Sequence, residues 1–259
     1  MRNEIIAGNE DTRLLKIIAG VCMIVDHVGS RIFTGVLELR IIGRIAFPLY
    51  VWCLVVGACH TRNGYRYALR LLLAGIISQP FYMVGLAHPW SKICVFGPLL
   101  LGYLAILGIR EKKHGSQYWA PLAALLVTQF VNMDYGMNGV LLIILLYLAR
   151  ENRGAILAVM VSFCLYWGSG GANLRSFCGI PLQDGVFSLP IVRAFMHQQT
   201  MALLSLPLML WPRKTCLRWP SGLAAYAIYP GHLLILWIVQ LLMGLTTLEK
   251  SLKLLIPWM

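Results

Sequence analysis

Apolar runs recur from Leu14 almost to the C-terminus of this 259-residue chain, separated by short polar breaks. Hydrophobic residues make up 59% of the sequence, and the mean hydropathy is +0.72. Soluble domains average only about 45–50% apolar residues. The sequence therefore predicts a single integral-membrane domain over residues 1–259, built as an all-α polytopic bundle.

Nine of these runs are candidates for transmembrane helices. A span needs about 17 to 25 residues, which five runs supply. The other four cross only if the bilayer thins or if polar flanks join the helix, so the expected total is about nine, within a range of about eight to ten. The long runs are residues 14–33, 41–58, 67–86, 93–109 and 223–245, and the short ones are residues 118–131, 139–149, 155–167 and 201–211.

Lys and Arg are shared unevenly between the breaks of this predicted bundle. Eleven follow the even-numbered helices and five follow the odd-numbered ones. Because cytoplasmic loops carry the excess, we expect a cytoplasmic N-terminus and an outward break at 168–199, which forms a re-entrant or interfacial lid. The net charge of +12 thus indicates membrane lipid rather than nucleic acid as a partner. The eleven are Arg62, Arg66, Arg70, Arg110, Lys112, Lys113, Arg150, Arg153, Arg213, Lys214 and Arg218, and the five are Arg31, Arg40, Lys92, Arg175 and Arg193.

Asp26 and His27 lie deep inside the first apolar run. An ionisable side chain at membrane depth costs roughly 2.5 to 3.5 kcal/mol on insertion scales, so the pair needs an explanation. A neutral histidine serves as a general base, and a neighbouring carboxylate can fix its tautomer. A polar pair that holds helices together and a proton relay in a transporter are the alternatives.

Lys16 and His27 are eleven residues apart, which is about three helical turns and about 16 Å along the axis. They therefore project from nearly the same face of the first helix, with Gly20 and Met23 between them. A cation at the mouth and an imidazole further in suit a long anionic cofactor whose reactive end reaches into the bilayer.

The second run opens with Arg40 and Arg44, one helical turn apart. Arg40 is explained as an end residue whose side chain reaches back to the interface. Arg44 lies inside the span and needs a partner, either Asp26 or an anionic ligand. Arg62, Arg66 and Arg70 follow as a ridge that either binds phosphate or anchors the cytoplasmic side.

Five further polar residues are candidates for a substrate-binding or cavity lining: Gln79, Tyr135, Asn138, Tyr229 and His232. Gln79 precedes a proline inside the third run, and Tyr229 and His232 surround another proline in the last run. Tyr135 and Asn138 belong to an outward turn. Simple turn chemistry and a satisfied core histidine are the alternative explanations.

The seven cysteines are scattered singly and form no metal-ligand spacing, so we expect no metal and no disulfide framework. Serine-nucleophile, phosphate-loop and dinucleotide motifs are likewise missing from the sequence. These observations argue against hydrolases and nucleotide-driven pumps.

Several segments together resemble the TraX family of membrane proteins, which N-acetylate pilin in bacterial conjugation systems. The more specific of them carry the DH and GRIAFP sequences, and the stretch from about 150 to 220 matches only as hydrophobic sequence. The segments are LKIIAGVCMIVDHVG (15–29), IGRIAFPLYVW (42–52), GACHTRNGYRYALRL (57–71), ISQPF (77–81), MDYGMNGVLLI (133–143) and YAIYPGHLLIL (226–236).

The resemblance implies an acetyltransferase of the bacterial inner membrane that uses acetyl-CoA as co-substrate. The spacing of Lys16 and His27 is also similar to the signature of the type 3 membrane acyltransferases, although these more often have Arg at the first position. Carried over, His27 is the catalytic base and Asp26 orients it. Lys16 and Arg44, with the cytoplasmic Arg62, Arg66 and Arg70, then hold the phosphates of CoA.

Three functions follow from these observations. The first is transfer of an acetyl group to an amine, such as the N-terminus of a pilin-like protein. The second is O-acetylation of a surface glycan or lipid-linked sugar. The third is a proton-coupled transporter, which ranks lower because no inverted repeat is evident and Asp26 is the one carboxylate well inside a long run.

Overall fold

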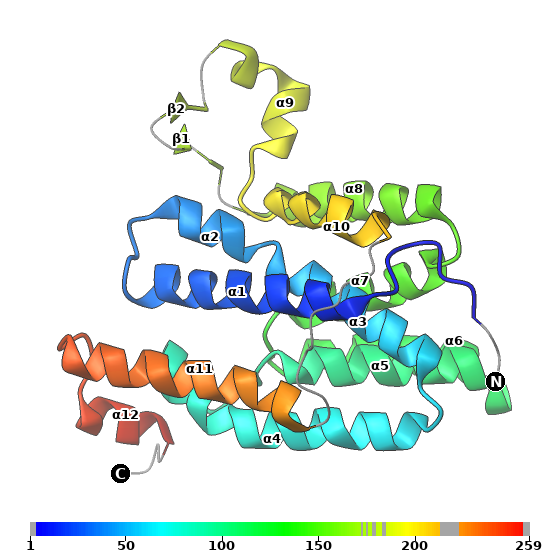
Figure 1. The fold of residues 1–259 in the computed structure, drawn as a ribbon, viewed down its shortest axis with the longest axis horizontal. Coiled ribbons are helices and arrows are strands. Elements are labelled where there is room, and N and C mark those ends of the chain that lie inside the picture. Colours follow the sequence, from blue (N-terminus) through cyan, green and yellow to red (C-terminus); the bar gives the residue numbers. More distant parts are fainter. Residues whose placement is uncertain are drawn as a thin grey trace. The chain divides into compact units, whose positions relative to one another are not determined.

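The computed structural model describes residues 4–171, 173–174, 176–177, 180–182, 185–212 and 223–255. This part of the chain is predominantly helical, as predicted (Figure 1). Arg175, Arg213, Lys214 and Arg218 lie outside the described residues, so their predicted cytoplasmic or outward placement stays a prediction. Among the described residues, two short strands depart from the all-α expectation: β1 (Ser176–Phe177), which pairs antiparallel with β2 (Ile180–Pro181).

Contacts divide the chain into two compact units. The first comprises Met1–Glu4, Leu54–Tyr147 and Arg218–Met259, and the second comprises Ile5–Cys53 and Leu148–Leu217. Each is described by itself below. The prediction of one domain over the whole chain stays a prediction.

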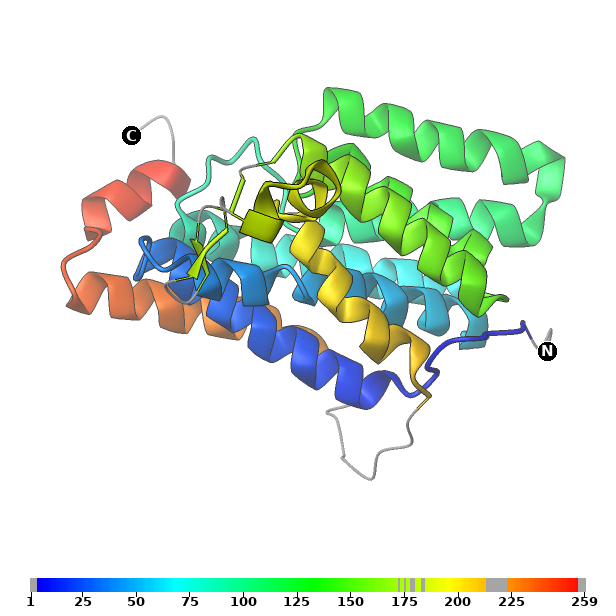
Figure 2. The ribbon, with the colours of Figure 1, turned by 90° about the horizontal axis from the view of Figure 1, so that it is seen from above.

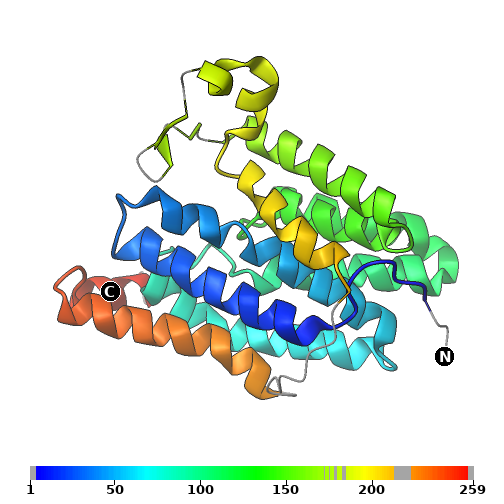
Figure 3. The same cartoon turned by 45° about the horizontal axis from the view of Figure 1, so that its top comes forward.

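The second unit begins with α1 (Thr12–Arg31) and α2 (Leu37–Gly43), which pack side by side (Figure 3). Asp11 starts α1 because its side chain accepts a hydrogen bond from the backbone N–H of Arg13. The other elements of this unit are the first half of α3 (Ala46–His60), α8 (Arg153–Ser169), η2 (Gly185–Ser188), α9 (Pro190–Phe195), η3 (Thr200–Ser205) and α10 (Leu206–Leu210).

The first unit contains the rest of α3, most of α7 and four other long helices. In Figure 2, α5 and α6 form an antiparallel pair joined by the short η1. Its apolar core joins α5, α6 and α7 through Ala105, Ala124, Val140 and Ile144. Its elements are α4 (Gly64–Leu86), α5 (Phe96–Glu111), η1 (Lys113–Gly115), α6 (Ser116–Phe130), α7 (Gly136–Ala149), α11 (Leu223–Leu242) and α12 (Leu248–Leu255).

Three predicted helices differ from those in the structure. The run at 41–58 is interrupted at Arg44 and Ile45, which separates α2 from α3. The run at 201–211 is a 3₁₀-helix followed by one short α-helix, and the run at 223–245 ends earlier, at Leu242. The sequence did not predict α12. Pro80 lies inside α4 without ending it.

The lengths and compositions of the helices do not confirm the expected total of about nine transmembrane helices. Among the described residues, two helical stretches are long and apolar enough to cross a membrane: Leu37–His60, which joins α2 to α3, and Gly64–Leu86. Four shorter apolar helices accompany them, in Gly136–Ala149, Arg153–Ser169, Thr200–Leu210 and Tyr226–Leu242.

Candidate functional site

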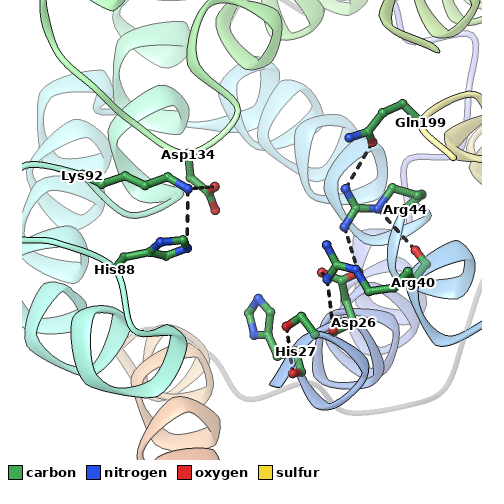
Figure 4. A network of polar contacts seen from close by, with 9 residues as sticks. Asp26, His27, Arg40, Arg44, His88, Lys92, Asp134 and Gln199 are labelled. Carbon is green, nitrogen blue, oxygen red and sulfur yellow. Dashed lines mark hydrogen bonds and ion pairs between the residues drawn. The ribbon is translucent and has the colours of Figure 1, made fainter. Parts of the chain in front are cut away.

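The second unit contains a buried carboxylate bound by two arginines (Figure 4). Asp26 Oδ2 lies 2.8 Å from Nη1 of Arg40, and Asp26 Oδ1 lies 2.8 Å from Nη2 of Arg44. The side chains of Asp26 and Arg44 are 11% and 8% exposed. This is the partner that Arg44 needed, and it is one of the two that the sequence left open.

The local fold explains why this cluster forms. Asp26 faces α2 from the penultimate turn of α1, and Gly43 ends α2 directly against its carboxylate. A Cβ at position 43 would overlap the carboxylate, so a side chain cannot be accommodated there without a shift. The helix then stops, and Nε of Arg44 donates to the carbonyl oxygen of Arg40 at 3.3 Å. The break between α2 and α3 is therefore part of the site.

Arg44 has all three guanidinium nitrogens engaged. Besides Asp26 and the carbonyl of Arg40, its Nη1 donates to Oε1 of Gln199 at 3.1 Å. A buried guanidinium that already donates a hydrogen bond from each of its three nitrogens is poorly suited to bind the phosphates of CoA. Sequence reasoning missed Gln199, because it lies 155 residues away in the longest polar break and follows no local pattern.

Arg40 has a larger role than the interfacial one expected from the sequence. Its Nη1 also donates, at 3.2 Å, to the backbone carbonyl of Asp26, which belongs to the peptide bond preceding His27. Its side chain remains 29% exposed. Two arginines share one carboxylate here, so the cluster carries one positive charge in excess, and Arg40 is its more accessible member.

His27 is half-buried on α1, and its carbonyl accepts a hydrogen bond from Oγ of Ser30 at 2.9 Å. In Figure 4 its imidazole and the carboxylate of Asp26 leave the helix on different sides. Both carboxylate oxygens of Asp26 face guanidinium groups. This geometry favours charge pairing over tautomer control as the function of Asp26.

The predicted stripe on α1 runs from Lys16 past Gly20 and Met23 to His27. Lys16 and His27 are half-buried, whereas Gly20 and Met23 are buried. The hydroxyl of Tyr50 lies 3.5 Å from the position that a Cβ of Gly20 would occupy. The middle of the stripe is thus buried, and α3 covers it at Gly20.

The arginine ridge is shorter than predicted. Arg62 precedes α4, whose first turn is capped by Asn63 through a hydrogen bond from the backbone N–H of Arg66. Arg66 and Arg70 lie one turn apart on the helix, and all three arginines are exposed. Their proposed contact with CoA phosphates stays a prediction.

Gln79 joins two backbone groups in the first unit. Its Nε2 donates to the carbonyl of Lys92 at 2.7 Å, and its Oε1 accepts from the N–H of Cys94 at 2.9 Å. Lys92 Nζ lies 3.4 Å from Oδ1 of Asp134 and 3.4 Å from Nε2 of His88 (Figure 4). These contacts explain Gln79 as a residue that holds the α4–α5 connection in place.

The remaining candidates also belong to the first unit. The rings of Tyr229 and His232 are 5.4 Å apart, and Nδ1 of His232 contacts the carbonyl of Ile228 at 3.0 Å. Tyr135 has a left-handed backbone with φ of +61°. Asn138 is half-buried in the first turn of α7. In the described part of the chain, no hydrogen bond connects Gln79 with these four residues.

Comparison with known proteins places the chain in a family. The family described as TraX protein matches residues 11–240. The chain belongs to the TraX protein family. This membership, together with the apolar helices, identifies it as a membrane protein. The matched region contains the whole Asp26 cluster, and it ends before α12 begins.

Two curated relatives resemble parts of this TraX-family chain. A probable fimbrial assembly protein, FimC of serogroup H1 from Dichelobacter nodosus, is 42% identical over 72 residues, which cover 26% of this chain and 30% of that protein. An uncharacterised protein of Rickettsia prowazekii (strain Madrid E) is 27% identical over 146 residues, which cover 54% of this chain and 56% of that protein. The matches thus span about half or less of these relatives. No solved structure matches the chain.

Proposed function

We propose that this chain is an acetyltransferase of the bacterial inner membrane, with its N-terminus in the cytoplasm. In this proposal it moves an acetyl group from acetyl-CoA to an amine, and the N-terminus of a pilin-like protein is the acceptor. Membership of the TraX family and the similarity to a fimbrial assembly protein support a pilin-related role. The structural observation that carries the proposal is the excess positive charge of the Asp26 cluster, next in the chain to His27.

The chemistry assigns one role to each group. His27 accepts a proton from the attacking amine, whose nitrogen forms a bond to the acetyl carbon. The carbonyl oxygen becomes an oxyanion, which the exposed edge of Arg40 stabilises because a fixed positive charge is most effective in a site of low dielectric constant. The carbon–sulfur bond then breaks, and the thiolate of CoA takes the proton back from His27.

The phosphate contacts are assigned by accessibility. Lys16 is half-buried near the start of α1, at the predicted cytoplasmic mouth, and fits a contact with the CoA phosphates. Arg44 does not fit, because it is buried and each of its three guanidinium nitrogens already donates to Asp26, Arg40 or Gln199. In this proposal Arg44 and Asp26 position Arg40 and the backbone of His27, and they touch no substrate.

A transfer assay with purified protein in vesicles tests the proposal. The donor is acetyl-CoA labelled in its acetyl group, and the acceptors are a peptide with a free N-terminus and the same peptide with a blocked one. We expect label on the free peptide, and a loss of about 10²- to 10⁴-fold in His27→Gln. The matched control is His60→Gln, in the last turn of α3, whose ring contacts the carbonyl of Val56.

The same assay separates the alternatives. An acetyl ester on a glycan or lipid is released by hydroxylamine, whereas an acetyl amide is not, so the chemistry of the product distinguishes O- from N-transfer. Label that accumulates inside vesicles without covalent attachment indicates transport. Unchanged transfer in His27→Gln contradicts the assignment of the base, and absence of transfer to peptide, glycan and lipid alike contradicts the enzyme class.

A further inference from the structure

The C-terminal helix α12 has a face of its own that neither the sequence nor the family match explains. It spans Leu248–Leu255, after the end of the matched region at residue 240. With eight residues it is about 12 Å long and cannot cross a bilayer. It packs along α4 (Figure 1), and Nε1 of Trp237 in α11 donates to Oγ of Ser251 at 2.9 Å. The helix is therefore anchored on one side.

The side next to this anchor is apolar and exposed. Leu248, Leu252 and Leu255 follow one another at helical spacing and are 60%, 48% and 38% exposed. Buried Ser251 falls at one edge of this row, so the leucines adjoin the anchored side without being covered by it. Exposed apolar residues also lead into the row from the end of α11, namely Leu242, Met243 and Leu245.

The opposite side of α12 is charged. Glu249 and Lys253 form an exposed i,i+4 ion pair at 2.7 Å, and Lys250 is exposed as well. Two lysines against one glutamate leave the polar side with a positive charge. A short helix with an exposed apolar row, a basic polar side and no possibility of spanning has the pattern of a helix that lies in the plane of a membrane surface.

We propose that α12 is an interfacial helix, whose leucine row inserts at the boundary between lipid headgroups and acyl chains while its lysines face anionic headgroups. The occupant of the apolar row is thus lipid. The continuity of the row with the exposed end of α11 supports lipid over a protein partner, because both surfaces then share one environment. This inference is independent of acetyl transfer, and it fixes the membrane depth of the C-terminal end of α11.

Depth-dependent quenching tests the proposal on the full chain in vesicles of zwitterionic and anionic lipid. Leu252→Cys and Lys253→Cys carry an environment-sensitive fluorophore, one on each side of the helix. Both are built on a background of Cys178→Ser and Cys216→Ser, because the five cysteines in the described part of the chain are buried. Leu248→Cys is a second reporter for the apolar row, and far-UV circular dichroism verifies that each variant folds.

The proposal has a defined pattern of outcomes. A nitroxide placed high on the acyl chain should quench the fluorophores at positions 252 and 248 at least about three times as strongly as the fluorophore at position 253, because an interfacial helix is buried by only about 5–10 Å. Aqueous iodide should show the reverse order. Equal access of iodide to both sides overturns the proposal. So does strongest quenching by a nitroxide near the bilayer centre, or a row shielded from both quenchers, which indicates a second copy or another protein.

Discussion

Removing the charge of Asp26 should be among the most destabilising single changes in the second unit. Asp26→Asn keeps the shape against Gly43 but removes the carboxylate charge that two guanidinium groups pair with, and one of them, Arg44, is only 8% exposed. A unit-charge pair at about 4 Å is worth about 4 kcal/mol at an effective dielectric constant of about 20. Because removal of one partner from a buried pair costs about 3–5 kcal/mol, we expect about 3 kcal/mol for Asn, which retains one acceptor oxygen.

Replacing Arg44 should restore more of the stability lost in Asp26→Asn than replacing Arg40 does. Adding Arg44→Met to Asp26→Asn removes the buried guanidinium that has lost its pairing with the carboxylate, and should bring the free energy of unfolding to within about 2 kcal/mol of wild type. Adding Arg40→Met should help less, because that side chain is 29% exposed and its charge can be solvated.

Reversible unfolding in mixed micelles, followed by far-UV circular dichroism, gives the required free energies. Glu249→Gln is the matched control, because its ion pair with Lys253 is exposed and should contribute no more than about 0.5 kcal/mol. A value for Asp26→Asn within about 1 kcal/mol of wild type refutes the reasoning. Equal rescue by the two arginine substitutions refutes it too, since burial then has no influence.

Three other substitutions test individual contacts, through the same unfolding measurement or through hydrogen exchange. Gly43→Ala places a methyl group against the carboxylate of Asp26 and should cost about 1–3 kcal/mol, whereas Gly35→Ala, with open space around it, should be close to neutral; equal effects contradict the close packing. Gln79→Leu leaves two backbone groups of the α4–α5 connection unpaired and should cost about 1–3 kcal/mol, with faster amide exchange confined to that connection. Arg110→Leu removes two hydrogen bonds to the end of α3, so α3 should fray there in hydrogen exchange while α6 stays unchanged.

Helices bounded by local signals were predictable from the sequence. The expected first and third runs agree with α1 and α4 to within a few residues, because Asp11 and Asn63 cap helices that continue as long apolar runs. The interruption at Arg44 was not predictable in this way, since the residues around it favour a continuous helix. It depends on a carboxylate 18 residues earlier in the chain, and such pairing is decided by packing rather than by local propensity.

The residues of the candidate site were likewise predictable from the sequence only in part. Asp26, His27 and Arg44 were recognisable because charged side chains are costly inside apolar runs. Whether Asp26 serves the histidine or the arginine is a matter of direction around the helix axis, which the composition of the run does not encode. Gln199 was beyond prediction for a related reason, because its partner Arg44 is distant in the chain and glutamine in a polar break is unremarkable by composition.

The packing of Gly43 on Asp26 also restricts how this region can change during evolution. A lineage that enlarges position 43 must move or shorten the carboxylate, and one that loses the carboxylate leaves Arg44 charged and buried. Single steps away from this arrangement therefore pass through destabilised proteins. Positions 26, 43 and 44 should consequently be inherited as a unit among relatives, and they should be replaced together where they are replaced at all.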